Sequence, residues 1–462
     1  MSYYDFIYIN KNKNKIIFYE LKKHINTIYM TSSVIGKLDN GLEYIVYSNK
    51  SIYTVSLVIS VKVGSIDEDI SVNGISHVLE HMIFKSNNKY KSKYELYKQL
   101  DSLGANFNAY TDKNVTTYYV KTHYNYFEKL VEMLSSLICN PNVSTDEFNI
   151  EKKVINEEIK NSYDEPSDII YNKLFSLIYP NTPIARDIAG TTDIIDNMTI
   201  DQINQHLNTF YKSNNMVISI VGNIPDNYLE ILKKSDFLKP NLSIDTITVQ
   251  PKYVSTITSQ LNLIDKKSLN QYFLGIGFPL VGHDDTDKYI IKLISAILSG
   301  SMSSRLFMEL RENQGLVYGI KTDIAQYYQG GIFYILTSFD KDYYIKVITC
   351  IMTQLQLIMN VLVSNDEINV WKNNIKNSLV IEFENTMEVA DYYAKQMLFF
   401  RNNITEYSSL NDKFADITDQ EILNVAKKIF NFSNMKTILL GNFGSEKKII
   451  IENITKIIKS HL

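Results

Sequence analysis

Hydrophobic and polar residues follow two different periods along this chain. Tyr53–Val63 and Val115–Lys121 are runs of apolar and β-branched residues that predict strands. Ser92–Leu103 and Tyr124–Cys139 place apolar residues three and four positions apart, which predicts amphipathic helices. Strands and helices mixed in this order predict an α+β fold, with a mixed or antiparallel sheet covered by helices.

The chain also contains an internal repeat. The segment Thr199–Asn223 (TIDQINQHLNTFYKSNNMVISIVGN) aligns without a gap with Thr418–Asn442 (TDQEILNVAKKIFNFSNMKTILLGN) at an offset of 219 residues. Each copy predicts a helix with a threonine N-cap, a turn at the asparagines and a buried strand that ends at glycine. The simplest explanation is a chain built from two homologous half-domains.

The length of 462 residues supports this division, because it is too long for one ordinary core. We predict an N-terminal extension over residues 1–30, a first half over 31–238, a linker over 239–253 and a second half over 254–462. The linker contains two prolines and few charges.

Composition excludes several classes of protein. The formal net charge of −4 gives no reason to expect nucleic acid or an anionic membrane surface as a partner. The 2 cysteines cannot form a disulfide framework or a cysteine-based zinc site, which suggests the cytoplasm or another reducing compartment, an organelle matrix included. No run approaches the roughly 18 apolar residues of a membrane span, so we expect none.

One segment carries recognisable chemistry. Gly74–Lys85 reads GISHVLEHMIFK, and its two histidines, His77 and His81, are four positions apart, so on a helix they project from one face. That spacing lets two imidazoles bind one zinc ion, and Glu80 on the neighbouring face can reach a water at the metal. Two ordinary histidines on an amphipathic helix are the alternative, but the pattern should arise by chance in only roughly 0.005 chains of this composition.

A catalytic zinc site commonly has three protein ligands, so a third is needed. The helix predicted for Thr145–Lys160 offers Glu151, Glu157 and Glu158. Glu151 and Glu158 lie beside its apolar stripe and face the same way, whereas Glu157 points nearly opposite. Helical phase therefore favours Glu158 as the ligand, with Glu151 supporting it, although three surface acids would give the same pattern.

The segment GISHVLEHMIFK, followed by the glutamate-rich EKKVINEEIK, resembles the M16 (pitrilysin-type) metallopeptidases, and among them the mitochondrial and bacterial processing peptidases. The resemblance extends from KLDNGLEYIVY to LLGNFG, nearly the whole chain. That family has two similar halves, of which only the first keeps the zinc motif, in agreement with the repeat. The resemblance implies that His77, His81 and Glu158 bind the zinc ion. It also implies that Glu80 is the general base and that Glu151 is a supporting acid.

Two further segments resemble motifs of the family. LGANFNAYTDKNVTTYYV is similar to the edge strand that binds substrate, which implies that role for Asn108, Ala109 and Tyr110. SGSMSSRLFMELRENQGLVYGI is similar to a second-half motif whose arginine and tyrosine bind substrate, here Arg311 and Tyr318. A plain strand and a solvated helix arginine would give the same local patterns.

The sequence therefore predicts a zinc-dependent endopeptidase that cleaves short or unfolded peptides or presequence-like segments, with Glu80 as general base. The resemblance implies a homodimer, or a heterodimer with a related subunit. The alternative is a non-catalytic or partner-dependent subunit of such a hetero-oligomer, since some family members have lost the zinc motif.

Overall fold

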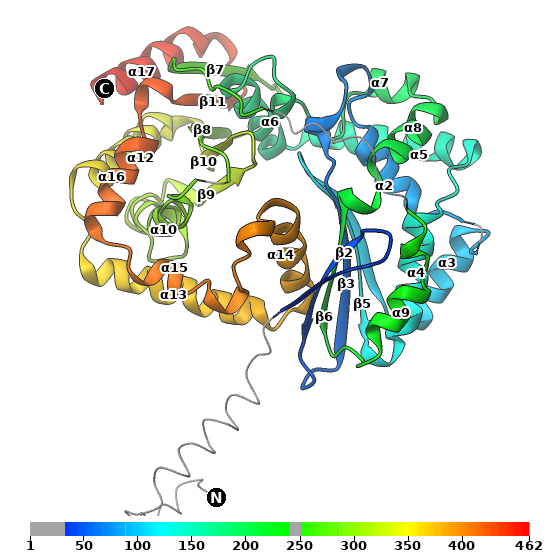
Figure 1. The fold of residues 1–462 in the computed structure, drawn as a ribbon. Coiled ribbons are helices and arrows are strands. Elements are labelled where there is room, and N and C mark those ends of the chain that lie inside the picture. Colours follow the sequence, from blue (N-terminus) through cyan, green and yellow to red (C-terminus); the bar gives the residue numbers. More distant parts are fainter. Residues whose placement is uncertain (1–32, 88, 241–250, 284, 462) are drawn as a thin grey trace, which may run out of the picture.

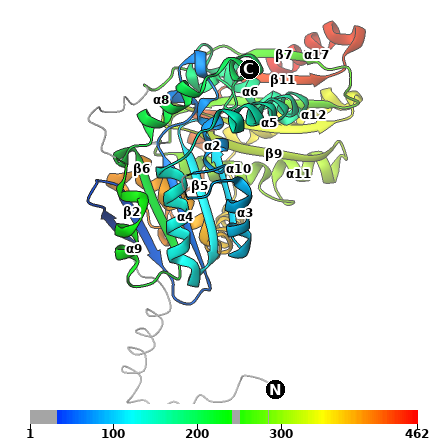
Figure 2. The ribbon, with the colours of Figure 1, turned by 90° about the vertical axis from the view of Figure 1, so that its right-hand side faces the viewer.

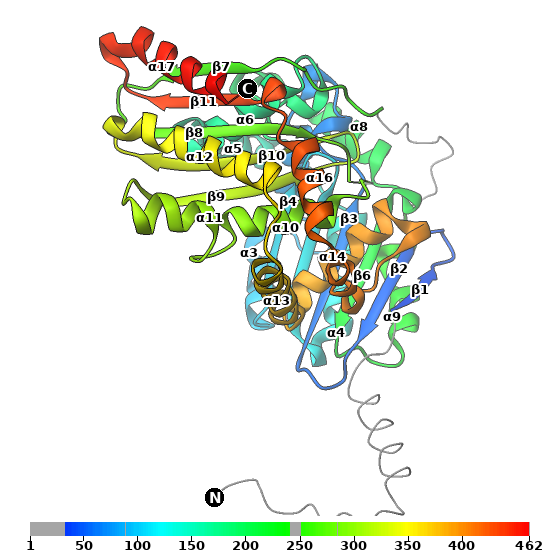
Figure 3. The ribbon, with the colours of Figure 1, turned by 90° about the vertical axis from the view of Figure 1, so that its left-hand side faces the viewer.

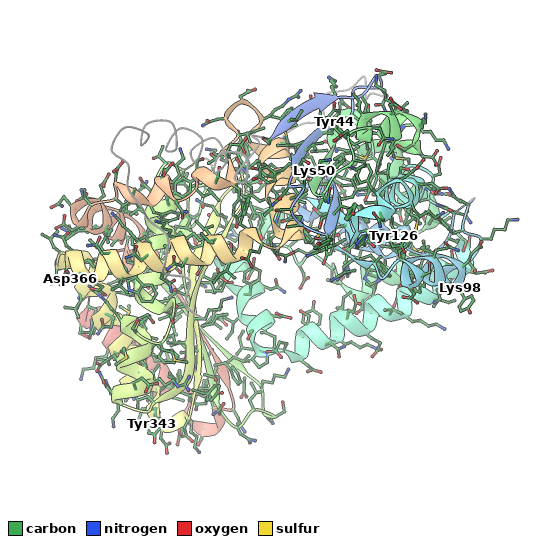
Figure 4. All side chains as sticks on the ribbon, turned by 90° about the horizontal axis from the view of Figure 1, so that it is seen from below. Tyr44, Lys50, Lys98, Tyr126, Tyr343 and Asp366 are labelled. Atoms are coloured by element: carbon green, nitrogen blue, oxygen red, sulfur yellow. The ribbon has the colours of Figure 1, made fainter. Side chains whose placement is uncertain are left out.

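The computed structural model describes residues 33–240 and 251–461, apart from residues 88 and 284. The predicted N-terminal extension over residues 1–30 and most of the predicted linker over 239–253 lie outside the described residues. Two sheets, each with its own helices, lie side by side in Figure 1. In the view from below, Asp366 and Lys98 mark opposite ends of the molecule (Figure 4).

The first sheet has six strands in the order β1-β2-β6-β3-β5-β4. Strand β2 is parallel to β6, and the other neighbours are antiparallel. The apolar runs of the sequence form its central strands, which are buried, whereas β1 and β4 are edges. The strands are β1 (Val34–Lys37), β2 (Glu43–Ser48), β3 (Thr54–Val61), β4 (Asn106–Thr111), β5 (Thr116–His123) and β6 (Met216–Gly222).

The second sheet repeats this arrangement without a counterpart of β1. Its order is β7-β11-β8-β10-β9, again with one parallel pair, β7 and β11 (Figure 3). The predicted α+β fold with two halves, each a mixed sheet covered by helices, is therefore confirmed. The strands are β7 (Gln260–Asp265), β8 (Tyr272–Leu280), β9 (Val317–Gln326), β10 (Gly331–Phe339) and β11 (Lys436–Gly441).

Helices cover both sheets. The first half contributes α2 (Ile75–Ile83), α3 (Lys93–Ser102), α4 (Phe127–Cys139), α5 (Thr145–Asp164), α6 (Pro166–Ile178), α7 (Thr192–Asn197), α8 (Ile200–Phe210) and α9 (Tyr228–Lys234). The second half contributes α10 (Lys288–Ser299), α11 (Arg305–Phe307), a π-helical turn (Met308–Asn313), α12 (Tyr344–Asn360), α13 (Asn365–Phe383), α14 (Thr386–Phe399), α15 (Asp412–Ala415), α16 (Asp419–Ile429) and α17 (Lys447–Ser460).

The sequence repeat corresponds to a repeated structure. Helices α8 and α16 both begin with a capping box, made by Thr199 with Gln202 and by Thr418 with Glu421. Each helix leads through a short 3-10 turn into a fully buried strand, β6 or β11, that ends at glycine. The predicted helix, turn and strand are thus present in both halves.

The two halves exchange one helix each, which the sequence did not reveal. Helix α6 of the first half packs on β8 and β11 of the second sheet, where Gly275 leaves room for it: a Cβ there would lie 2.1 Å from Cγ2 of Ile170. Helix α14 of the second half packs on β3 and β6 of the first sheet (Figure 1), and Tyr393 stacks on Tyr47. Each sheet is therefore covered on one face by a helix from the other half.

No single described helix is both long and apolar enough to cross a bilayer. One helix pair, Lys341–Asn360 with Asn365–Phe383, passes by length and composition together but is bent by 105°.

Candidate metal centre

Helix α2, which carries both histidines, has a tightly held N-terminus. Gly74 precedes the helix with φ 99°, and a Cβ there would lie 2.5 Å from the carbonyl oxygen of Ala189, so only glycine fits. The buried carboxylate of Glu68 accepts hydrogen bonds from the backbone N–H groups of Gly74 (2.7 Å) and Ser76 (2.9 Å) and from Asn73 Nδ2 (2.8 Å). Two of these donors are backbone N–H groups at the start of the helix that have no partner within it, so Glu68 fixes where α2 begins.

Three side chains from α2 and α5 converge beside each other. Glu158 Oε2 lies 3.7 Å from His77 Nε2 and 3.4 Å from His81 Nε2. One ligand atom from each of the three residues lies within 4.8 Å of the others, and among the described residues no other group of histidine, cysteine and acidic side chains meets this criterion. Helices α2 and α5 also pack directly on each other (Figure 2), which holds the three side chains together.

The donor set fits zinc. Two imidazole nitrogens and one carboxylate oxygen are a usual set of protein ligands for a catalytic zinc ion, and they leave a position open for water or substrate. His81 uses its other nitrogen, Nδ1, for Glu151 Oε2 at 3.2 Å, which leaves Nε2 directed at the cluster. Lys85 Nζ in turn lies 2.7 Å from Glu151 Oε1. The buried Glu151 therefore orients His81, as carboxylates commonly orient metal-binding histidines.

The acids and histidines of the cluster have shifted pKa values. Burial, aided by the charge of His81, lowers the pKa of His77 to about 4. Burial also disfavours a charge on His81, but hydrogen bonds with Glu151 and Glu158 outweigh it and raise its pKa to about 9. A hydrogen bond from His81 lowers the pKa of Glu158. At neutral pH one proton is thus held on His81 between two carboxylates.

Glu80 lies next to this cluster but takes no part in it. Its carboxylate oxygen Oε2 accepts a hydrogen bond of 2.7 Å from the hydroxyl of Thr111, the last residue of β4. Burial raises the pKa of Glu80, against the opposing effect of that hydrogen bond. Glu157, by contrast, is exposed and paired with Lys160 at 2.7 Å, as helical phase had predicted.

Strand β4 forms a free edge of the first sheet and leads to Glu80. Asp112 N–H donates to Val115 C=O across the hairpin, so in the alternating ladder the N–H group of Ala109 faces outward. That N–H is bonded instead to the side chain of Asn108, at 2.9 Å. The hydroxyl of Tyr110 donates to Asp391 of α14. Of the three residues expected to bind substrate, Asn108 and Ala109 thus lie on an open edge, whereas the Tyr110 hydroxyl already has a protein partner.

The second-half residues expected to bind substrate lie together. The guanidinium carbon of Arg311 is 5.1 Å from the ring centre of Tyr318, and the Tyr318 side chain is 85% exposed. Arg311 belongs to the π-helical turn and Tyr318 to the edge strand β9. Within the part of the chain that the structure describes, no ion pair or hydrogen bond joins Arg311 or Tyr318 to the histidine cluster.

Three residues that contact the site were not predicted from sequence. They are Glu68, Lys85 and Thr111. Glu68 and Thr111 reach α2 from loops and strands outside it, so no helical period marks them. Lys85 follows His81 by four positions, the one usable signal, because a residue four positions on can share a partner with its neighbour on the same face.

Comparison with protein-family models gives two matches. The model described as "Insulinase (Peptidase family M16)" matches residues 44–192, which include α2 and α5. The model described as "Peptidase M16 inactive domain" matches residues 197–375. The first match contains His77, His81 and Glu158, and the second contains none of these three residues.

Similar proteins and structures cover most of the chain. An uncharacterized zinc protease of Rickettsia felis is 27% identical over 409 residues, which is 88% of this chain and 97% of the relative. One of Bacillus subtilis is 27% identical over 393 residues, or 85% and 94%. A protease structure from Helicobacter pylori superposes with a TM-score of 0.83 at 22% identity, covering 89% of this chain and 100% of the other. An M16 inactive-domain structure from Pseudomonas fluorescens gives 0.79 at 17% identity, covering 89% and 98%.

Proposed function

Since this chain belongs to the M16 family of zinc proteases, we propose that it is an endopeptidase that hydrolyses internal bonds of short or unfolded peptides. His77, His81 and Glu158 would hold the zinc ion, and Glu151 would orient His81. The observation that carries this proposal is the convergence of three ligand atoms beside a carboxylate that is not a ligand.

Zinc bound by these residues supplies a Lewis acid that polarises the scissile carbonyl and increases the acidity of water. Glu80 would accept the proton of the attacking water and deliver it to the leaving amine. Burial suits it to this task, because it raises the pKa of Glu80 toward the range in which a carboxylate can both take and return a proton. Thr111 donates to one carboxylate oxygen and leaves the other for the proton.

Strand β4 would hold the substrate. An extended peptide can pair with an exposed edge, where main-chain hydrogen bonds provide affinity without demanding a particular sequence. The outward N–H of Ala109 is one such donor, once Asn108 releases it. Because β4 ends at Thr111, a peptide paired with this edge would reach Glu80 and the metal ligands at the end of the strand.

Arg311 and Tyr318 would contact the peptide from the second half. The exposed ring of Tyr318 can pack on a peptide, and Arg311 beside it supplies donors for carbonyl or carboxylate oxygens. We expect Arg311→Ala to retain zinc and to weaken both peptide binding and turnover.

The test is Glu80→Gln, measured by metal analysis, peptide binding and hydrolysis of a quenched fluorescent peptide. The variant keeps the shape and hydrogen-bonding reach of the side chain but loses its basicity, so it should hold about one zinc per chain and bind peptide while turning over about 10²–10⁴-fold more slowly. Glu157→Gln is the matched control and should resemble the wild type. Wild-type activity in Glu80→Gln would refute the mechanism, and loss of zinc would make Glu80 a structural residue.

A further inference from the structure

Tyr110 and Thr111, the last two residues of β4, and Asp112, which follows them, contact the two halves in turn: the second half, the first half and again the second half. We call them the bridge segment. The middle residue, Thr111, contacts Glu80 in the first half. The residues on either side of it both bind side chains of the second half, more than 200 positions away in the sequence. The segment therefore joins the proposed general base to the half that carries no metal ligand.

The first contact is made by helix α14. Tyr110 donates its hydroxyl proton to Asp391 Oδ1, while Asp391 Oδ2 is paired with Lys395 Nζ at 2.8 Å. Lys395 also lies 5.1 Å from the centre of the Tyr110 ring. Burial and the charge of Asp391 raise the pKa of the Tyr110 hydroxyl, so the hydroxyl keeps its proton and is a donor at neutral pH.

The second contact is made by Tyr327, which follows the last residue of β9. Its hydroxyl donates to Asp112 Oδ1 at 2.8 Å, and its ring is buried. Tyr171 of α6 is within 3.3 Å of the same hydroxyl. Asp112 is further fixed by the hydrogen bond from its N–H to the carbonyl of Val115. Both residues beside Thr111 are thus held by buried or half-buried polar contacts.

We propose that Asp391 and Tyr327 are positioning residues for the peptidase reaction, which hold the bridge segment so that Thr111 keeps Glu80 in its working orientation. An edge strand has a ladder partner on one side only, here β5, so its end is free to shift unless other contacts fix it. A shift of about 1 Å at a reacting group is enough to cost about 10²-fold in rate. This inference rests on the proposed function and gives the second half a part in the chemistry.

The experiment uses Asp391→Ala, which removes the acceptor of the Tyr110 hydroxyl, and Tyr327→Phe, which removes the donor to Asp112, in the full chain, each alone and combined with Glu80→Gln. Because the contacts act through Thr111, each variant should lower kcat by about 10-fold or more, while zinc content stays at the wild-type level and KM changes little. In the Glu80→Gln background neither variant should lower the residual rate further, because the group being positioned has already lost its basicity.

The matched control is Glu367→Gln, which breaks the ion pair between Glu367 and Arg305 (2.7 and 2.8 Å) inside the second half. It should lower the melting temperature and leave kcat unchanged. The inference is overturned if kcat is unchanged in both bridge variants, or if kcat falls equally with and without Glu80. A wild type no faster than Glu80→Gln would overturn the proposed function as well. Tyr327→Phe decides the matter if Asp391→Ala does not fold.

Discussion

At the scale of single residues, the two histidines of the centre differ in charge at neutral pH. His77 is neutral at pH 7, since its pKa is about 4, whereas the pKa of His81 is about 9, so it carries a proton. A metal ligand must be the neutral imidazole. On the proposed assignment of His81 as a zinc ligand, zinc binding has to displace the proton that His81 carries.

The expected consequence is pH-dependent affinity. Between about pH 5 and pH 8 the metal-free His81 is protonated and His77 is not, so zinc binding should release about one proton, and the apparent affinity should fall about tenfold for each unit that the pH is lowered. Isothermal titration calorimetry in two buffers of different ionisation enthalpy measures the released proton. Glu157→Gln should behave as the wild type, and no release at pH 7 would contradict the charge state given to His81.

The two adjacent acids of α5 give a second prediction. Glu158 lies within 3.7 Å of both imidazoles, whereas Glu157 faces solvent with Lys160. Glu158→Gln should weaken zinc binding by more than about 100-fold, beyond the usual loss for an orienting partner, while Glu157→Gln should be silent. Competition with a chelator measures both constants. The reverse order would require α5 to be rotated about its axis.

Sequence reasoning was well suited to part of this site. His77, Glu80 and His81 lie within one turn and a half of one helix, so their relative placement follows from the helical period alone. The period also selected Glu158 over Glu157, although not the contact between two helices that brings Glu158 to the histidines. Glu68 and Thr111 depend on how loops and strands return to α2, and no local pattern encodes that.

At the scale of elements, β4 differs from the central strands of its sheet because it pairs on one side only, with β5. Its position at the edge decides which backbone groups remain for a peptide. Local sequence predicted β5 and the flanking helices well, because their apolar periods are long. It gave only a resemblance for β4, since a half-exposed edge strand has weak alternation: its residues are all exposed or intermediate in burial.

The edge can be tested at one backbone group. Ala109→Pro removes the outward N–H and keeps the ladder with β5, because proline is tolerated on an edge when its missing N–H faces away from the neighbour. We expect KM to rise about 10-fold, with the zinc content unchanged. Ala109→Ser, which keeps the N–H, is the control. Unaltered KM in the proline variant would show that the peptide binds elsewhere.

At the scale of the whole molecule, assembly follows from the family resemblance and not from any contact described above. We expect multi-angle light scattering to show a dimer, or a monomer that stays inactive until a related chain is added. A fully active monomer would contradict this expectation.

The exchanged helices α6 and α14 predict how the halves respond to a cut. Each half carries the helix that covers the sheet of the other, so separation would expose an apolar face on both sheets. A specific protease site placed in the predicted linker over residues 239–253 should therefore give two fragments that elute together in gel filtration and separate only in denaturant. Elution as two separate folded fragments would show that the exchange contributes little.

The exchange of helices also has a consequence for the joining of the two halves in one chain. Two polypeptides that trade an identical helix form a domain-swapped dimer, and this chain has that geometry with the two members fused. Fusion makes their association independent of protein concentration and fixes the ratio at one metal-bearing member to one without. A swapped pair of identical halves would carry two metal centres. In the fused chain, one half can lack metal ligands and still supply the other half with a helix and with Tyr327 at the end of β9.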